Sequence, residues 1–376
     1  MRYYIIAGEA SGDMYGALLM RALKRRDPEA EFRFWGGDAM AAEGGTPVRH
    51  IRDLAIMGFV EVALRLRTVL GNISLCKNDI EAFSPDVVVG VDYPGFNLRI
   101  ERWAKERGYR TVHYISPNLW AWKKNRVNGM RLSLDRLCYI LPFEEKFFAD
   151  NDMPQAIYVG HPLLDAINDK CGVGHEGLAD APTDSPAGKP VIALLPGSRR
   201  QELKNSLPQM VALASRHPEY RFVVAGMSII DKELYNKLMP AESNIEVVYD
   251  RTYDVLRSAY AAVVCSGTAT LETALFNVPQ VVCYRANPIT IAIAKAIVSS
   301  RIRYISLVNL IADSPIVTEL IQEDFNANRL EAEFIRITAD ADNRKRMQNE
   351  YANMRLLLGD GGASERTADE IISLLK

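Results

Sequence analysis

Residues 3–26 read YYIIAGEASGDMYGALLMRALKRR, and this stretch decides the fold class. Tyr3–Ala7 is a short apolar run typical of a buried strand, whereas Met14–Arg26 has apolar residues at helical spacing and a basic C-terminal end. The turn between them contains Gly8 and Gly12, which allow the backbone to turn closely. A strand that leads through such a turn into a helix is the first part of a βαβ unit.

The same alternation continues along the chain. Strand-like runs follow at Glu31–Trp35, Asp86–Val91, Thr111–Ile115, Leu137–Leu141, Ile157–Val159, Val191–Leu195, Arg221–Ala225, Ile245–Tyr249, Ala261–Cys265 and Gln280–Tyr284. Helical patterns such as Gln201–Arg216 separate them, and after Asn309 the chain is almost wholly helical to Lys376. Because strands that alternate with helices form right-handed βαβ units, we predict an α/β fold of two facing Rossmann-like domains, each with a doubly wound parallel sheet.

Residues 171–189 interrupt the alternation, because they contain four Gly and two Pro and have no apolar periodicity. We interpret them as a linker or surface loop between an N-terminal domain at 1–170 and a second domain that begins at 190. Ligands of open α/β sheets bind beyond the carboxyl ends of the strands. We therefore expect the functional residues in the short polar turns at those ends.

The composition excludes several classes of protein. Lys and Arg number 45 and Asp and Glu 47, so no basic excess predicts nucleic-acid binding. No apolar run reaches the ~18 residues that span a bilayer, and the N-terminus does not read as a signal peptide. The five cysteines lack paired spacing and the five histidines lack a metal-ligand pattern. We expect a cytoplasmic protein with reduced thiols, no metal and no nucleic-acid partner.

The turn Gly8–Asp13 is a candidate anion site. Its glycines let the backbone approach a ligand, and the N-terminus of a helix attracts negative charge. It is not the GxGxxG dinucleotide fingerprint, because its later glycines are misplaced. The alternative is a plain strand–turn–helix connection with Asp13 in the first helical turn.

Asp92 follows the apolar run Asp86–Val91 and precedes Tyr93-Pro94-Gly95-Phe96-Asn97. A carboxylate at the mouth of a buried strand is partly desolvated, which makes it a better proton acceptor. Asp92 is therefore a candidate general base. The alternative is an Asp that initiates a turn before Pro and Gly.

Pro196-Gly197-Ser198-Arg199-Arg200 ends another strand and opens a helix. Backbone N–H groups, the Ser198 hydroxyl and two guanidinium groups form a candidate diphosphate site, with Arg199 nearest the turn. The alternative is an ordinary basic first turn. Positive charge at a helix N-terminus opposes the helix dipole, so an anionic ligand explains the pattern better.

Ser266-Gly267-Thr268-Ala269-Thr270-Leu271-Glu272 has the same strand–turn–helix form. Ser266 to Thr268 offer donors to a phosphate, and Glu272 is placed to accept hydrogen bonds from a ribose diol. The alternative is a helix cap followed by a Glu that the helix dipole favours, and the two interpretations are compatible.

Residues 57–70 are unusually apolar for a segment between strands. One helical stripe contains Phe59, Val62, Leu66, Val69 and Leu70, while Arg65 and Arg67 lie between apolar positions outside it. The ordinary interpretation is a helix that faces the core. An apolar surplus beside arginines also fits a surface that contacts a bilayer or a lipid.

Trp120 and Trp122 lie beside three cations in residues 114–126. Such a segment can hold a sugar face or a phosphate, or it can cap the sheet. It resembles a nucleic-acid patch only superficially, because no wider basic field supports it.

Taken together, these segments resemble the lipid-A-disaccharide synthases, which are inverting glycosyltransferases of the GT-B class. The resemblance rests on GEASGD (Gly8–Asp13), MGFVEV (Met57–Val62), DYPGFN (Asp92–Asn97), YISPNLWAWKKNRV (Tyr114–Val127), VGHPLLD (Val159–Asp165), LLPGSR (Leu194–Arg199), SGTATLE (Ser266–Glu272) and NLIA (Asn309–Ala312). These motifs occur in the family's order.

The resemblance implies that UDP-2,3-diacylglucosamine donates its sugar to 2,3-diacylglucosamine 1-phosphate (lipid X), giving a β-1,6-linked disaccharide 1-phosphate and UDP. It implies a UDP-binding domain at 190–350 and a last helix, 351–376, that packs on the first domain. It also implies an enzyme peripheral to the inner membrane, without a metal or other cofactor, and a possible homodimer.

The resemblance assigns roles to single residues. Asp92 is the general base, with Glu9 as a further polar position in the active site. The UDP side comprises Gly197, Ser198, Arg199, Ser266, Gly267, Thr268, Glu272 and Asn309; the acceptor side comprises Ser11, Gly12, Asn97, Ser116 and Trp120; the lipid contact comprises the stripe in 57–70 with its two arginines. The rival interpretations are a GT-B-like UDP-sugar epimerase or hydrolase, and a non-catalytic protein that binds nucleotide sugars.

Overall fold

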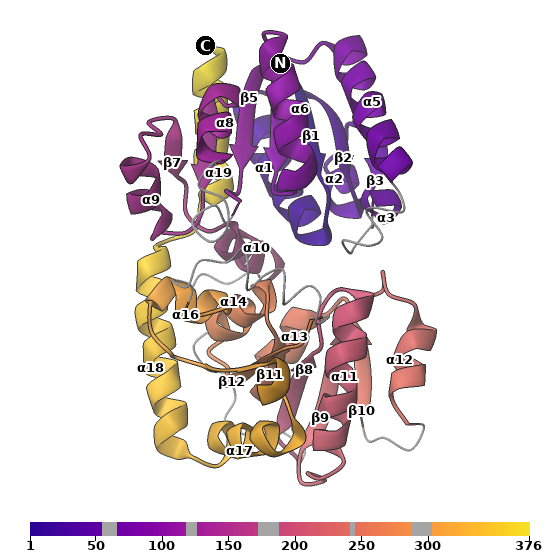
Figure 1. Cartoon of the computed structure of the whole chain (residues 1–376), viewed down its shortest axis with the longest axis vertical. Helices are drawn as coiled ribbons and strands as arrows, with labels where there is room; N and C mark the ends of the chain where they lie inside the picture. The colour runs from indigo at the N-terminus through magenta and orange to yellow at the C-terminus, as the bar shows by residue number, and fades with distance from the viewer. Residues whose placement is uncertain (55–65, 118–125, 172–187, 241–244, 287–302) are drawn as a thin grey trace. The chain divides into compact units, whose positions relative to one another are not determined.

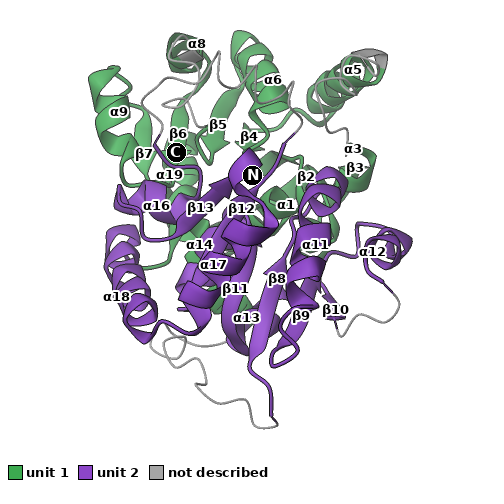
Figure 2. Ribbon diagram, turned by 60° about the horizontal axis from the view of Figure 1, so that its bottom comes forward, with its two compact units in different colours: residues 1–170, 360–376 green, residues 171–359 purple. Residues whose placement is uncertain are grey.

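The structure is a computed structural model that describes residues 1–54, 66–117, 126–171, 188–240, 245–286 and 303–376. It divides into two compact units, which Figure 2 distinguishes by colour. The first consists of Met1–Lys170 and Asp360–Lys376, and the second of Cys171–Gly359. Each unit has its own parallel sheet and its own core.

The first unit contains a sheet of seven parallel strands in the order β3-β2-β1-β4-β5-β6-β7 (Figure 1). The strands are β1 (Arg2–Ala7), β2 (Glu31–Gly36), β3 (Thr46–His50), β4 (Val87–Val91), β5 (Arg110–Tyr114), β6 (Arg136–Tyr139) and β7 (Ala156–Tyr158). The helices are α1 (Ala10–Arg26), α2 (Asp38–Ala42), α3 (Ile51–Leu54), α5 (Leu66–Phe83), α6 (Pro94–Glu106), α8 (Arg126–Ser133), α9 (Glu144–Asp150), α10 (Pro162–Cys171) and α19 (Ala363–Leu375). The central strand β4 is buried at every residue, as a sheet covered on both faces requires.

The second unit contains a sheet of six parallel strands in the order β10-β9-β8-β11-β12-β13. The strands are β8 (Val191–Leu195), β9 (Arg221–Gly226), β10 (Ile245–Tyr249), β11 (Ala259–Cys265), β12 (Gln280–Tyr284) and β13 (Thr318–Ile321). The helices are α11 (Arg200–Ala214), α12 (Lys232–Leu238), α13 (Thr252–Arg257), α14 (Thr268–Leu275), α16 (Leu307–Ala312), the 3-10 turn η2 (Gln322–Asp324), α17 (Ala327–Thr338) and α18 (Ala341–Leu358).

The prediction of an α/β fold with two parallel-sheet domains is confirmed. Two edge strands were missed, and β13 makes the prediction of an almost wholly helical chain after Asn309 wrong. Both strands are short, and β3 contains Pro47 while β13 contains Glu319, so neither shows the apolar run of a central strand. Helix α1 begins at Ala10 rather than at Met14, so most of the predicted turn forms its first turn.

Each sheet reverses its strand order beside its first strand, which is the usual place for a ligand site in such folds. In the first unit this switch point lies between β1 and β4, where Ala7 pairs with Val91. In the second unit it lies between β8 and β11, where Leu195 pairs with Val264. The four turns that sequence analysis selected follow these four strands, so each pair of turns meets at one switch point.

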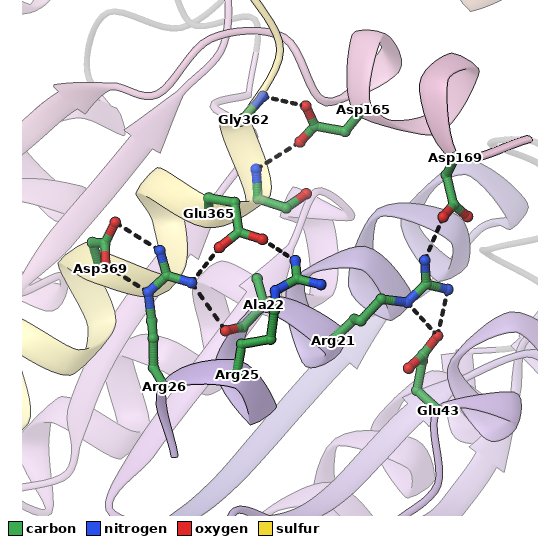
Figure 3. A network of polar contacts seen from close by, with 11 residues as sticks. Arg21, Ala22, Arg25, Arg26, Glu43, Asp165, Asp169, Gly362, Glu365 and Asp369 are labelled. Carbon is green, nitrogen blue, oxygen red and sulfur yellow. Dashed lines mark hydrogen bonds and ion pairs between the residues drawn. The ribbon is translucent and has the colours of Figure 1, made fainter. Parts of the chain in front are cut away.

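The C-terminal helix α19 packs on the first unit, against α1. Its Ile371 is completely buried, and its N-terminus is held by Asp165, whose carboxylate accepts hydrogen bonds from the Gly362 and Ser364 N–H groups. Figure 3 shows that Arg25 and Arg26 of α1 meet acidic side chains of α19, namely Glu365 and Asp369. Because these ion pairs are partly exposed, the apolar face contributes most of the stabilisation.

The predicted division at 350/351 falls inside α18, which continues to Leu358 before the chain enters α19. The predicted linker, 171–189, lies mostly outside the described residues. Among the helices of the described ranges, none has the length and apolar character needed to cross a membrane.

Candidate active site

Asp92 lies at the carboxyl end of β4, where the backbone is sharply bent. Asp92 and Tyr93 have left-handed φ values of 49° and 52°, after which Pro94 starts α6. The Asp92 N–H donates to the Tyr114 carbonyl at 2.8 Å. This conformation places a half-exposed carboxylate at the switch point, as a general base requires.

Asn97 supports this turn through hydrogen bonds from its side-chain amide. Its completely buried amide Nδ2 donates to the Asp92 carbonyl at 2.7 Å and to the Ile6 carbonyl at 3.1 Å. It therefore ties the end of β4 to the end of β1. The predicted acceptor residue Asn97 is thus a support for the Asp92 backbone in this structure, because it has no exposed surface for a ligand.

Glu9 is the residue that precedes α1, on the β1 side of the same switch point. The Tyr93 ring covers Gly8 so closely that a Cβ there would overlap it. Burial, with a contribution from the charge of Glu9, raises the pKa of Tyr93, which places Glu9 near that ring. Glu9 and Asp92 thus flank Tyr93 at one end of the sheet.

The remaining residues of the first motif have different surroundings. Ser11 is half-buried in the first turn of α1, and a Cβ at Gly12 would lie 3.3 Å from the Ala7 Cβ. Asp13 accepts hydrogen bonds from the Gly37, Ala39 and Met40 N–H groups, so it caps α2 rather than facing a ligand. Of the two carboxylates in this motif, Glu9 is therefore the candidate for the site.

Ser116 follows β5 and is nearly buried. Its hydroxyl donates to the Pro117 carbonyl at 3.0 Å, and it also forms a hydrogen bond with the buried Glu144. Burial raises the pKa of Glu144 to about 8. Glu144 was not predicted as a buried residue, because Phe143-Glu144-Glu145-Lys146 is a pattern typical of an exposed surface.

Two further buried residues, close enough to Asp92 for its charge to act on one of them, were not predicted from the sequence. His113 of β5 and Glu101 of α6 are completely buried, and His113 Nδ1 lies 2.7 Å from Glu101 Oε1. The only signal for them in the sequence is Gly90, a glycine within the apolar run of β4. A Cβ at Gly90 would overlap Glu101 Oε1.

In the second unit the turn Pro196–Arg199 carries the predicted anion site, but a carboxylate already occupies its backbone donors. Glu202 Oε2 accepts hydrogen bonds from the Ser198 N–H at 3.1 Å and from the Arg199 N–H at 3.3 Å. The left-handed Gly197 makes room for it, since a Cβ there would lie 2.5 Å from Glu202 Oε2. The Arg199 side chain is 45% exposed, and its Nη1 lies 3.6 Å from Glu202 Oε1. A diphosphate can reach that side chain, whereas it has to displace Glu202 to reach the backbone.

The second turn of this unit follows β11. Gly267 is exposed, and its neighbours Ser266 and Thr268 are half-buried, with Thr268 in the first turn of α14. Glu272 lies one turn further, where the Tyr253 hydroxyl donates to its Oε1 at 3.1 Å. Helix α14 is eight residues long and directs its N-terminus to the switch point, which suits a negatively charged group.

Asn309 is buried, and its amide is used within the unit. Its Nδ2 donates to the Val317 carbonyl at 2.9 Å and to Glu319 Oε1 at 3.0 Å, while its Oδ1 accepts from the Val317 N–H. Glu319 in turn accepts from Ser306, and the neighbouring Ile305 carbonyl accepts from the Ser266 hydroxyl. Asn309 therefore supports, through Glu319, the segment Ile305–Ser306 that Ser266 contacts.

Part of the predicted lipid contact lies outside the described residues, namely Phe59, Val62 and Arg65, as does Trp120. Leu66 and Arg67 begin α5, and their side chains are likewise outside the description. Val69 is half-buried and Leu70 is 54% exposed. Val69 and Leu70 are thus the members of the predicted stripe whose side chains are described, and the stripe as a whole stays a prediction.

Comparison with known proteins agrees with this arrangement. The fold is similar to that of solved structures that include the glycotransferase of kitacinnamycin (15% identity, TM-score 0.64, covering 100% of this chain and 99% of the other). It is also similar to UDP-GlcNAc 2-epimerase from Neisseria meningitidis bound to UDP-GlcNAc (13% identity, TM-score 0.62, covering 99% and 100%). At these identities the likeness shows the fold alone, which is the GT-B fold.

Sequence relatives are more specific. The family model described as lipid-A-disaccharide synthetase matches residues 3–374. The lipid-A-disaccharide synthase of Chromohalobacter salexigens is 37% identical over 100% of this chain and 97% of its own length. That of Geobacter sulfurreducens is 34% identical with the same coverage. With the motifs assembled at the two switch points, the chain belongs to the lipid-A-disaccharide synthase family.

Proposed function

We propose that this protein transfers the sugar of UDP-2,3-diacylglucosamine to the primary hydroxyl of 2,3-diacylglucosamine 1-phosphate. The products are the β-1,6-linked disaccharide 1-phosphate and UDP. The observation that carries the proposal is the match to the lipid-A-disaccharide synthetase model over residues 3–374. The carboxylate at one switch point and the anion-binding turns at the other support it.

Asp92 acts as the general base. The acceptor oxygen forms a bond to the anomeric carbon of the donor as the bond from that carbon to the diphosphate oxygen breaks. The proton of the hydroxyl passes to the Asp92 carboxylate, and the electron pair leaves with UDP. A positioned base typically contributes ~10²–10⁴-fold to such a step. Attack from the face opposite UDP inverts the anomeric centre.

The second unit binds the UDP moiety. Its exposed Arg199 guanidinium and the N-terminus of α14 stabilise the charge that develops on the diphosphate, and Glu272 accepts hydrogen bonds from the ribose. Support comes from related folds, since one similar structure is described as an S. aureus MnaA-UDP co-structure, with 15% identity, TM-score 0.66 and coverage of 100% and 96%.

The acyl chains of both substrates explain the apolar 57–70 segment. We place this segment and the start of α5 against the inner-membrane surface, with the enzyme in the cytoplasm, and the exposed Leu70 and Leu75 of α5 support this placement. The substitutions Leu70→Glu and Leu75→Glu are expected to weaken sedimentation with anionic vesicles. Unchanged sedimentation of a folded double variant would contradict the placement. A homodimer stays a proposal that gel filtration with light scattering tests.

Incubation with both substrates in detergent, followed by mass spectrometry, tests the reaction. The proposal expects a disaccharide 1-phosphate that forms only when both substrates are present. Conversion of UDP-diacylglucosamine without acceptor would instead identify an epimerase or hydrolase. Binding of the nucleotide sugar without any turnover would identify a non-catalytic protein.

A further inference from the structure

A polar cluster lies inside the first unit, between β4, β5 and α6. It consists of Asn97, Glu101 and His113, and each of these side chains is 0% exposed. Buried polar groups are costly unless they are hydrogen-bonded. Three atoms of the cluster, Asn97 Oδ1, Glu101 Oε2 and His113 Nε2, have no hydrogen-bond partner among the described residues. The cluster is therefore poorly explained by stability alone.

Glu101 and His113 form an ion pair. His113 Nδ1 lies 2.7 Å from Glu101 Oε1, which is the distance of a charge-assisted hydrogen bond. Burial by itself lowers the pKa of His113, but the charge and hydrogen bond of Glu101 outweigh it and hold the pKa of His113 above its usual range. The imidazole therefore carries a proton over a wider pH range than a free histidine does.

The backbone is shaped to admit this pair. His113 pairs in register with Gly90 on one side and with Leu137 on the other, so neither strand neighbour brings a charge. A Cβ at Gly90 would overlap Glu101 Oε1 and would lie 2.9 Å from the Asn97 Cβ. A glycine within a buried strand weakens it, and here it leaves the space that the carboxylate fills.

The pair acts on Asp92. Among the described residues, Glu101 from α6 and Asp92 from the end of β4 are the charged side chains that act on His113, and both raise its pKa. Electrostatic coupling is mutual, so the protonated imidazole stabilises the ionised carboxylate of Asp92 in turn. Asn97, on the same helix as Glu101, fixes the Asp92 carbonyl at 2.7 Å.

From this geometry we infer that Glu101 and His113 are positioning residues, which keep Asp92 ionised and correctly placed to accept the proton of the acceptor hydroxyl. The inference rests on the proposed role of Asp92 as the general base. Replacement of a buried ion pair by uncharged residues is often tolerated and sometimes stabilising. Stability alone therefore does not account for Glu101 and His113, and we assign them a role in the reaction.

The test is the pH profile of kcat in His113→Gln, which keeps a hydrogen-bonding amide beside Glu101 and removes the positive charge that acts on Asp92. We expect the acidic limb of the profile to move to higher pH, because the Asp92 carboxylate loses a neighbouring positive charge while the negative charge of Glu101 remains. The affinity for UDP should stay unchanged. A limb that coincides with that of the unchanged protein would overturn the inference.

His161→Gln is the matched control, because His161 is also a buried histidine of the first unit. Burial lowers the pKa of His161 to about 3, so it is neutral and carries no charge to Asp92. This variant should leave the position of the acidic limb unchanged. A shift as large as that of His113→Gln would assign the effect to general loosening of the unit, and it would overturn the inference.

A second measurement does not require the His113→Gln variant to fold. Titration of His113 by NMR in Asp92→Asn should give a lower pKa than in the unchanged protein, because one of the groups that raise it is gone. An unaltered pKa would contradict the coupling. The proposed function fails separately: if Asp92→Asn retains near-normal turnover, Asp92 is not the base, whatever the titration of His113 shows.

Discussion

Glu144 gives the sharpest quantitative prediction, because it is 1% exposed and its carboxylate oxygen Oε1 has no hydrogen-bond partner in the described part of the chain. Burial raises its pKa from 4.5 to about 8. A folded-state pKa above the unfolded value means that the folded protein binds the proton more tightly. The stabilisation is then complete below pH 4.5 and is lost as pH rises through 8.

The magnitude follows from the pKa difference. At pH 7 the unfolded carboxyl is ionised and the folded one is largely neutral, so about 2.5 pH units at ~1.4 kcal/mol each correspond to about 3.5 kcal/mol of stability lost relative to acid. Glu144→Gln removes this loss, because the amide stays neutral and its oxygen can accept from the Leu141 N–H as the carboxylate does. We expect the variant to be more stable at pH 7–8 and similar to the unchanged protein near pH 4.5.

Tryptophan fluorescence during urea unfolding measures this effect selectively. All four tryptophans (Trp35, Trp103, Trp120 and Trp122) belong to residues 1–170, so the signal reports the unit that contains Glu144. Glu145→Gln is the control, because the neighbouring Glu145 is exposed. Equal pH dependence of stability in the Glu144→Gln variant and in the unchanged protein would refute the reasoning.

Three further predictions concern other buried or anion-binding groups. Burial lowers the folded-state pKa of His161 to about 3, so between about pH 6.5 and pH 3 only the unfolded chain binds a proton at this residue. The free energy of unfolding should therefore fall by ~1.4 kcal/mol for each pH unit below about 6.5. His161→Gln should flatten this slope in urea unfolding. Gly90→Ala should destabilise the first unit by about 1–3 kcal/mol through overpacking, whereas Gly95→Ala, whose Cβ would meet nothing within 4 Å, should be near neutral in the same assay. Glu202→Gln should tighten UDP binding in calorimetry by removing a competing negative charge, and Arg199→Ala should weaken it; the opposite order would contradict the proposed diphosphate site.

Most of the framework was predictable, because central parallel strands are continuous apolar runs. Val87–Val91 and Val191–Leu195 are buried at every residue, and the polar turns after them are visible in the sequence. Edge strands carry fewer buried residues, so Thr46–His50 and Thr318–Ile321 lack that signal. The order of the strands then brings together turns that lie about 70–85 residues apart in the chain.

The contacts made by polar side chains could not be predicted in the same way. Glu202 reads as an ordinary residue of a helical first turn, yet its carboxylate occupies the donors assigned to a phosphate. The resemblance places Asn309 on the UDP side, yet its amide binds Val317 and Glu319 at the start of β13, a strand that the sequence pattern did not reveal. The pairing of Glu101 with His113 depends on how α6 packs on the sheet, and no local pattern encodes it.

The central claim is that Asp92 takes the proton from the acceptor hydroxyl while the other unit holds UDP. Single-turnover transfer by Asp92→Asn, measured with both acylated substrates in detergent alongside calorimetric UDP binding, tests it directly. The account predicts UDP affinity close to that of the unchanged enzyme and a rate of disaccharide formation lower by ~10²–10⁴-fold. Near-normal transfer by this variant would contradict the account.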